Sequence, residues 1–147
     1  MLMEVKLSDG KGKTFMSYKV FFDTNILAYA FDLGSPKKNE QAKELISRWM
    51  PTGRMVISTQ VLQELFVVLT KKLEPKLSAD RAGEVIESLL GVEVKAVETD
   101  TILEAIKISK ENAISFWDTL IISSAFDSRC KMLFTEDLNS YSFQSQQ

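Results

Sequence analysis

The sequence predicts an α/β protein, a three-layer α/β/α sandwich around a mostly parallel central sheet of four to five strands. Short runs rich in β-branched and aromatic residues alternate along the chain with longer segments of helical period. Strands that alternate with helices favour a parallel sheet covered by helices on both faces. A length of 147 residues suits one domain with a substantial core and is short for two.

Four runs have the composition of short strands, and six segments have the pattern of helices. We expect strands at residues 18–22, 55–57, 92–97 and 131–135, and helices at residues 26–31, 36–50, 60–73, 78–90, 101–111 and 115–129. Pro36 suits the first turn of its helix, and Ser58 or Thr59 can cap the helix that follows the second strand. Thr101 and Glu104 have the spacing of a capping box.

The first 17 residues are polar, contain the run Asp9-Gly10-Lys11-Gly12 and show no sustained period. We interpret residues 1–17 as a flexible leader and residues 18–147 as one domain. The leader has no apolar segment typical of a signal peptide, and no run reaches the roughly 18 apolar residues of a membrane span. The sequence therefore predicts a cytoplasmic protein without a membrane partner.

The residue inventory excludes several kinds of chemistry. The chain contains no histidine and one cysteine, Cys130. Catalytic systems that pair histidine with serine or cysteine, and zinc sites built on imidazole or several thiolates, are therefore impossible. We expect Cys130 to be buried and inert. Carboxylates remain as the main reactive groups, and they favour hard divalent cations such as Mg²⁺ and Mn²⁺.

Four carboxylates have positions that could bring them together. Asp23 directly follows the first expected strand, and Asp137 lies two residues beyond the last one. Ligands in open α/β sheets bind beyond the carboxyl ends of the strands, so both residues would emerge at one edge of the sheet. Glu64 and Asp118 lie early in helices, and the helix that carries Glu64 leaves the second strand at that edge.

Helical geometry strengthens the case for Asp118. This residue shares a helix face with Ile121, Ile122 and Ala125, and therefore continues an apolar stripe. A carboxylate in that position costs free energy unless a cation, a helix N-terminus or hydrogen bonds compensate. Glu64 lies at the edge of the apolar stripe of its own helix.

Each carboxylate also has a purely structural interpretation. Asp118 is three residues after Ser115 and could belong to a capping box, and Asp23 could be a turn or cap residue. Glu64 could be a solvated helix residue, and Asp137 could belong to a turn. We expect Asp127 to be solvated and Glu136 to lie on the surface. The convergence of the four, rather than any one of them, indicates a metal site.

Four segments in order resemble the PIN-domain family, and within it the VapC-type toxin ribonucleases. These segments are residues 20–27 (VFFDTNIL), 58–64 (STQVLQE), 117–121 (WDTLI) and 133–138 (LFTEDL). The resemblance covers about residues 18 to 140. It implies a PIN-like fold and divalent-metal-dependent cleavage of RNA by an acidic quartet that matches Asp23, Glu64, Asp118 and Asp137.

The resemblance also assigns supporting roles and partners. Thr135 matches a hydroxyl that supports the site, and Asn25 matches a polar residue that orients the first aspartate. Toxin members are typically homodimers that an antitoxin protein silences. We therefore expect an RNA substrate, an antitoxin, a homodimer and Mg²⁺ or Mn²⁺ as the cofactor. The net charge of −2 does not favour a nucleic-acid binder, although a substrate held through metal ions needs no basic surface.

Two other functions remain open from the sequence. Asp23 could be the covalent nucleophile of a phosphatase, but the haloacid-dehalogenase-like pattern requires a second aspartate where this chain has Asn25. Alternatively, the chain could be a non-catalytic interaction module that keeps the fold as a scaffold. A nuclease is the hypothesis that uses all four carboxylates, because such a cluster can hold ions that activate water for phosphodiester hydrolysis.

Overall fold

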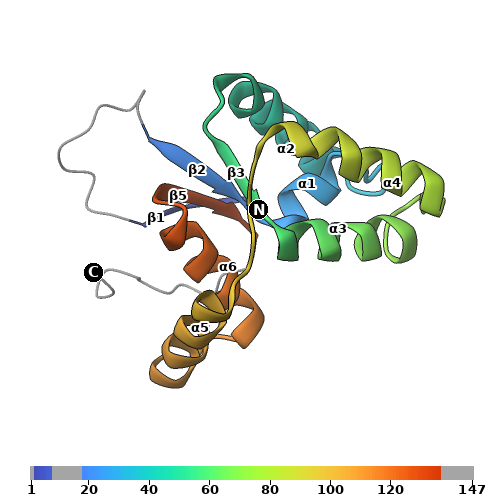
Figure 1. Cartoon of the computed structure of the whole chain (residues 1–147). Coiled ribbons are helices and arrows are strands. Elements are labelled where there is room, and N and C mark those ends of the chain that lie inside the picture. Colours follow the sequence, from blue (N-terminus) through green and yellow to red (C-terminus); the bar gives the residue numbers. More distant parts are fainter. Residues whose placement is uncertain (1, 8–17, 137–147) are drawn as a thin grey trace.

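A five-stranded sheet in the order β1-β5-β2-β3-β4 forms the centre of the computed structural model (Figure 1), which describes residues 2–7 and 18–136. Four of its strands are parallel, and β1 pairs antiparallel with β5. The strands are β1 (Met3–Lys6), β2 (Lys19–Phe22), β3 (Met55–Ser58), β4 (Glu93–Lys95) and β5 (Cys130–Thr135). The expected mixed sheet with mostly parallel strands is confirmed.

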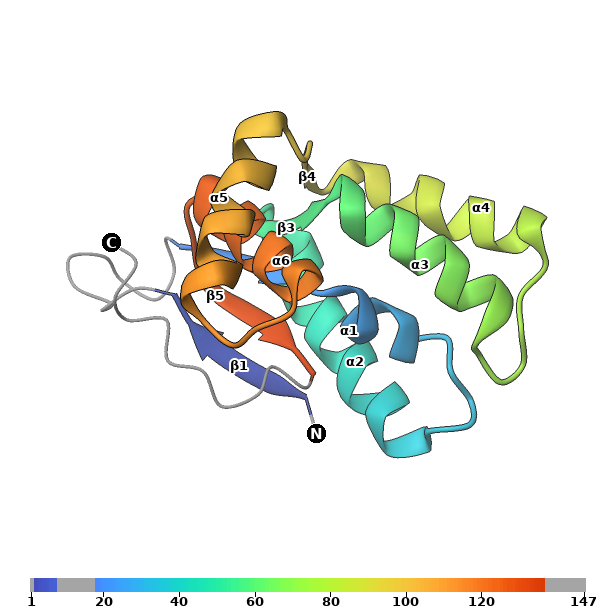
Figure 2. The same cartoon turned by 90° about the horizontal axis from the view of Figure 1, so that it is seen from below.

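Helices cover both faces of this sheet. They are α1 (Thr24–Tyr29), α2 (Pro36–Trp49), α3 (Thr59–Lys71), α4 (Ala79–Ser88), α5 (Thr99–Glu111) and α6 (Phe116–Asp127), with short 3₁₀ turns η2 (Met50–Thr52) and η3 (Leu89–Gly91). α5 and α6 pack together apart from the group α1–α4 (Figures 1 and 2). Right-handed crossovers explain this division. The crossovers from β2 to β3 and from β3 to β4 run in one direction along the sheet and place α1–α4 on one face, whereas the crossover from β4 to β5 runs in the other direction and places α5 and α6 on the opposite face.

The sheet owes its burial to runs of large apolar residues in its central strands. Phe21, Phe22, Val56, Ile57 and Leu133 are completely buried. Because helices cover both faces, consecutive residues of these strands can all be apolar, as the sequence shows. This packing fixes the carboxyl ends of β2 and β5 beside each other, with Phe21 opposite Leu133 in the register of the two strands.

Serine residues begin three of the helices as expected. The hydroxyl of Ser58 accepts from the Val61 amide at 3.3 Å, and Ser78 and Ser115 accept from the third residue beyond each of them at 3.2 Å. Such caps satisfy amide groups that have no partner inside the helix. Pro36 lies in the first turn of α2, also as expected.

The prediction of a leader over residues 1–17 is wrong for residues 3–6, which form the edge strand β1. Val5 pairs with Leu133, and Leu7 is buried. The polar composition hid this strand, because an edge strand needs few apolar residues and its partner lies at the other end of the chain. Residues 1 and 8–17 lie outside the described residues.

The capping box predicted at Thr101 is also wrong. α5 begins two residues earlier, and the Thr101 hydroxyl donates instead to Oδ2 of Asp127 on α6 at 2.7 Å. Thr101 is buried and Asp127 is exposed, as expected for the aspartate. A contact between two packed helices has therefore replaced the local hydrogen bond.

Cys130 is buried at the start of β5, and burial raises the pKa of its thiol to about 12. The predicted burial of Cys130 is confirmed, and a thiol with so high a pKa is expected to be a poor nucleophile. Among the helices described here, none combines the length and apolar character that crossing a bilayer requires.

A carboxylate-lined cavity as the candidate active site

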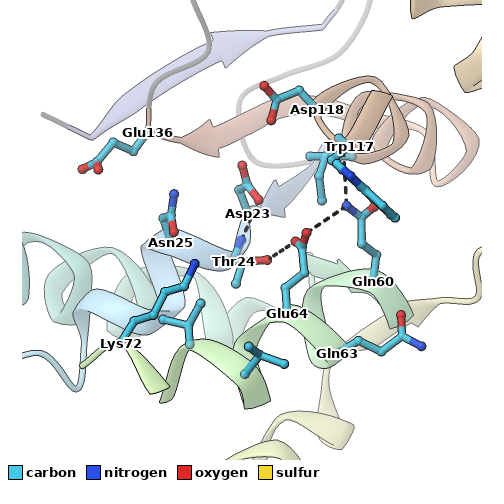
Figure 3. Close-up of a pocket in the computed structure, with 13 residues that line it drawn as sticks. Asp23, Thr24, Asn25, Gln60, Gln63, Glu64, Lys72, Trp117, Asp118 and Glu136 are labelled. Carbon is cyan, nitrogen blue, oxygen red and sulfur yellow. Dashed lines mark hydrogen bonds between the residues drawn. The ribbon is translucent and has the colours of Figure 1, made fainter. Parts of the chain in front are cut away.

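A cavity of about 610 Å³ opens where β2 and β5 end (Figure 3). From β2 the chain proceeds along the sheet to β3 and β4, and it then returns to place β5 on the other side of β2. The direction of the strand order therefore reverses between β2 and β5. Cavities at such a reversal are the usual ligand sites of open α/β sheets. Three of the four carboxylates predicted from the sequence, Asp23, Glu64 and Asp118, line this cavity.

Asp23 begins α1 directly after β2. Its Oδ1 accepts from the Thr24 amide at 2.7 Å, and its Oδ2 accepts from the Thr135 hydroxyl at 2.6 Å. These two hydrogen bonds fix the plane of the carboxylate and leave further lone pairs on both oxygens. The structural interpretation of Asp23 as a helix cap is therefore correct, and it does not compete with a place in the cavity.

The electrostatic environment of Asp23 is unfavourable for its charge. The pKa of Asp23 is raised to about 6, chiefly by burial and to a lesser extent by the charges of Glu64 and Asp118. The hydrogen bonds from Thr135 and Thr24 partly oppose this rise. A carboxylate with a raised pKa next to two other acids is typical of a cation-binding site.

Glu64 is partly buried on α3. Its Oε1 accepts from the Thr24 hydroxyl at 2.9 Å, and its Oε2 accepts from Gln60 Nε2 at 3.4 Å (Figure 3). Thr24 therefore links two carboxylates, because its amide binds Asp23 and its hydroxyl binds Glu64. This bridge excludes the interpretation of Glu64 as a freely solvated helix residue.

Asp118 lies in the first turn of α6, where its amide donates to the Ser115 hydroxyl at 3.2 Å. The side chain is partly buried and lines the cavity together with Ile121, in agreement with the predicted apolar stripe. Within residues 2–7 and 18–136, no hydrogen bond or ion pair holds the Asp118 carboxylate. Ser115 thus caps the helix while the Asp118 carboxylate remains available.

The remaining predicted residues differ in their placement. Thr135 binds Asp23 as described, and Asn25 is exposed and lines the cavity. The hydrogen bonds that orient Asp23 come from Thr24 and Thr135. Asp137 lies outside the described residues.

Glu136 does not lie free on the surface, and this prediction is wrong. Its carboxylate accepts from the Tyr29 hydroxyl at 2.6 Å and pairs with Lys38 Nζ at 2.9 Å, and its side chain is only 8% exposed. Burial opposes ionisation of Glu136, but the hydrogen bond from Tyr29 and the charge of Lys38 outweigh it and lower its pKa. These contacts tie the end of β5 to α1 and α2, directly beside the cavity.

Several residues at the cavity were not predicted from the sequence, and four of them bear on its chemistry. Thr24, Gln60, Lys72 and Trp117 line it together with the carboxylates. Gln60 precedes Glu64 by one helical turn and Trp117 precedes Asp118 directly, so their positions relative to the predicted carboxylates could have indicated them. Lys72 is the C-cap of α3, and only the fold shows that the end of this helix reaches the cavity.

The donor set suits a hard divalent cation. Carboxylate oxygens are the ligands that Mg²⁺ and Mn²⁺ prefer. Among the described residues that line the cavity, Lys72 is the one lysine, and it offsets only part of the negative charge of Asp23, Glu64 and Asp118. No three carboxylates among the described residues converge into a set that could hold an ion as they stand. Ligation would therefore draw on side-chain movement or on a donor outside these residues.

The fold and the cavity define a class: an α/β/α protein with an acidic cavity at the carboxyl ends of its parallel strands. The family model of the PIN domain matches residues 20–144, and the chain belongs to the PIN-domain family.

Solved structures of the same fold include a VapC toxin, a toxin–antitoxin complex and a VapBC complex bound to DNA. The VapC20 toxin of Mycobacterium tuberculosis, which cleaves the sarcin-ricin loop, is 21% identical with a TM-score of 0.60, and the match covers 75% of this chain and 83% of that one. A toxin–antitoxin complex from Klebsiella pneumoniae gives 20% identity, a TM-score of 0.59 and coverages of 76% and 82%. DNA-bound VapBC from Salmonella typhimurium is 24% identical with a TM-score of 0.54, and the match covers 74% of this chain and 79% of that one. No curated protein matches the chain significantly.

Proposed function

We propose that this protein is a divalent-metal-dependent endoribonuclease that hydrolyses RNA phosphodiester bonds and acts as the toxin of a toxin–antitoxin pair. One observation carries the proposal: Asp23, Glu64 and Asp118, from three separate elements, line one cavity in a member of the PIN-domain family. A scaffold without catalytic function would have no need to keep three acids together at the expense of their mutual repulsion.

Asp23, Glu64 and Asp118 would hold Mg²⁺ or Mn²⁺, together with Asp137, which follows Glu136 in the chain. A divalent ion bound there would activate a water molecule as the nucleophile and would offset negative charge on the attacked phosphate and the leaving oxygen. Such hydrolysis leaves a 5′-phosphate and a 3′-hydroxyl, and it does not require the 2′-hydroxyl of RNA.

The chain's own contribution is to orient these groups. The Thr24 amide and the Thr135 hydroxyl fix Asp23 from two sides, and the Thr24 hydroxyl fixes Glu64. These hydrogen bonds restrict the positions that Asp23 and Glu64 can take when an ion binds. The ion pair between Lys38 and Glu136, with the hydrogen bond from Tyr29, holds the end of β5 near this group.

Lys72 provides positive charge on the side of the cavity formed by α3. It is exposed and lines the cavity, and it forms no ion pair with the described carboxylates. Figure 3 shows its amine directed toward the space around Asn25 and Thr24. We assign it to a phosphate of the substrate next to the cleaved one, where a lysine acts as a point charge.

Partners and location follow from the same proposal. Two of the structural neighbours are toxin–antitoxin assemblies, from Klebsiella pneumoniae and Salmonella typhimurium, and they support an antitoxin protein as the partner of this chain. We further propose a homodimer that acts in the cytoplasm, where its RNA substrate is present.

The ends of the products test the proposed reaction. With Mg²⁺ or Mn²⁺, the protein is expected to cut RNA into fragments that carry 5′-phosphates, which an exonuclease specific for 5′-phosphate then degrades. A substrate with a single 2′-deoxy residue at the mapped cleavage site should be cut at a similar rate. Fragments with 2′,3′-cyclic phosphates, or complete resistance of the 2′-deoxy substrate, would contradict hydrolysis by activated water.

A further inference from the structure

A large aromatic side chain stands exposed at the cavity. Trp117 is 60% exposed although tryptophan is usually well buried, and it lines the same cavity as Asp23 and Asp118. The indole is nevertheless held in place. Its ring packs edge-on against Phe116 at 5.2 Å between centroids and 70° between planes. Gln60 Nε2 donates to the backbone carbonyl of Trp117 at 3.3 Å, which holds the main chain that carries the ring. Trp117 therefore offers an ordered aromatic surface to whatever enters the cavity.

A second observation points to a ligand beside this ring. Gln60 is only 4% exposed and lines the cavity, and its Oε1 is buried without a hydrogen-bond partner in the described structure. The orientation of the amide is fixed by chemistry, because Nε2 faces two acceptors, Glu64 Oε2 and the Trp117 carbonyl. An unpartnered buried acceptor is costly, so a donor from a ligand would complete the site.

We propose that Trp117 and Gln60 form a binding site for one unpaired nucleobase, so that the enzyme selects single-stranded RNA at the cavity. The base stacks on the indole of Trp117. A rotation of the Gln60 side chain, whose Oε1 is covered in the described structure, lets an N–H group on the edge of the base donate to that oxygen. Unpaired bases in RNA are typically recognised in this way, by stacking on aromatic rings and by hydrogen bonds to their edges. This proposal rests on the proposed function and specifies its substrate.

The surroundings of Trp117 favour a nucleobase over a protein partner. Its neighbours in the cavity include Gln60, Gln63 and Asp118, whereas the core of a protein interface is depleted of charged residues. The cavity volume of about 610 Å³ is in the range of small-molecule sites and can take a nucleotide. Figure 3 shows the indole on one side of the carboxylates and Lys72 on the other. A strand could thus place a base on Trp117 and a phosphate near Lys72.

Binding of a labelled RNA tests the proposal directly. The probe is a fluorescein-labelled single-stranded RNA of mixed sequence, with Ca²⁺ as the only divalent ion and the RNA checked to be intact after each titration. Trp117→Leu is expected to weaken binding by about 5-fold to 100-fold, the range of one lost base–aromatic stack. Trp117→Phe keeps an aromatic ring and should lose only a few-fold. Leu103→Ala removes a side chain that is 59% exposed outside the cavity and should bind as the wild type does.

Two further measurements separate base stacking from attraction of the RNA phosphates and from protein association. Inorganic polyphosphate, a polyanion without bases, should bind wild type and Trp117→Leu equally. Saturation with RNA should quench the exposed Trp117, whereas Trp49, which is only 4% exposed, keeps its emission in Trp117→Phe. Equal RNA binding by wild type and Trp117→Leu would overturn the proposal, and so would equal weakening for RNA and polyphosphate. A change of oligomeric state in Trp117→Leu with unchanged RNA affinity would place Trp117 in a protein interface instead.

Failure of this inference differs from failure of the proposed function. If the wild type cuts RNA with Mg²⁺ and Trp117→Leu binds RNA normally, the nuclease stands and the base site is refuted. If RNA binding depends on Trp117 but no metal condition yields cleavage, the base site stands and the enzymatic proposal is refuted. A wild type that does not bind the RNA probe at all refutes the base site.

Discussion

Asp23→Asn is expected to make the metal-free protein more stable and at the same time to slow RNA cleavage strongly. The pKa of Asp23 is raised from 3.8 to about 6, chiefly by burial, so its ionised form destabilises the folded state. The neutral amide removes this penalty of about 2–3 kcal/mol at pH 8. It also removes a proposed metal ligand, and the loss of several kcal/mol of transition-state stabilisation lowers the cleavage rate by about 100-fold or more.

The sign of the pH effect makes this prediction specific. Because the pKa of Asp23 is higher in the folded than in the unfolded chain, its destabilising contribution is absent below about pH 4 and grows as the pH rises through about 6. Urea unfolding of wild type and Asp23→Asn should therefore give similar free energies at pH 4 and should diverge at pH 8 in favour of the variant. Removing a destabilising functional group commonly has this result.

Asp80→Asn is the matched control, since Asp80 is exposed on α4 and does not line the cavity. It should leave the cleavage rate unchanged and should lower the stability at pH 8 by at most about 1 kcal/mol, because its charge lies in the first turn of α4. A loss of stability in Asp23→Asn at pH 8 would contradict the electrostatic description of the cavity, because it would show that the Asp23 charge stabilises the metal-free fold.

Added Mn²⁺ is expected to stabilise the wild-type protein strongly at pH 8. An ion that binds only the folded state contributes about 2.7 kcal/mol at a concentration 100 times its Kd. For a chain of 147 residues this corresponds to an increase in Tm of about 5–10 °C. The effect should be much smaller at pH 5, because Asp23, with a pKa of about 6, then holds a proton that the ion must displace.

Thermal unfolding with Mn²⁺ and with EDTA measures this effect, and Asp23→Asn supplies the comparison. The variant should show little increase in Tm at either pH, since it lacks one proposed ligand. An increase of the same size in wild type and variant would place the bound ion elsewhere on the protein and would contradict the assignment of Asp23 as a ligand.

The amino-acid sequence was sufficient to predict the four parallel strands of the sheet, the helices and the end of the sheet at which the cavity lies. Strong local patterns made this possible: apolar runs such as residues 20–22 and 55–57 form the buried strands β2 and β3, and Asp23 follows the first of them directly. The rule that ligands bind where parallel strands end then placed Asp23 at the site. Asp118 could be predicted because it interrupts an apolar helix face.

Features that depend on distant partners could not be predicted. β1 is recognisable as a strand only where it pairs with β5. Val5 of β1 lies opposite Leu133 of β5, although the two residues are far apart in the sequence. Thr101 has the sequence context of a helix cap, but its hydroxyl donates to Asp127 of the neighbouring helix α6. Glu136 has the sequence context of a surface residue, but in the folded protein Tyr29 and Lys38 bind its carboxylate. In each case a tertiary contact outweighs the local pattern.

Cleavage of a mixed RNA pool by wild type and Asp118→Asn tests the central claim most directly. Both proteins would be assayed in EDTA, Mg²⁺ and Mn²⁺, with Asp127→Asn as a control because Asp127 lies on the same helix outside the cavity. Wild type and Asp127→Asn are expected to cut only with a divalent ion, and Asp118→Asn to be slower by about 100-fold or more. Cleavage that persists in EDTA, or an equally fast Asp118→Asn, would contradict a metal-dependent site at these carboxylates.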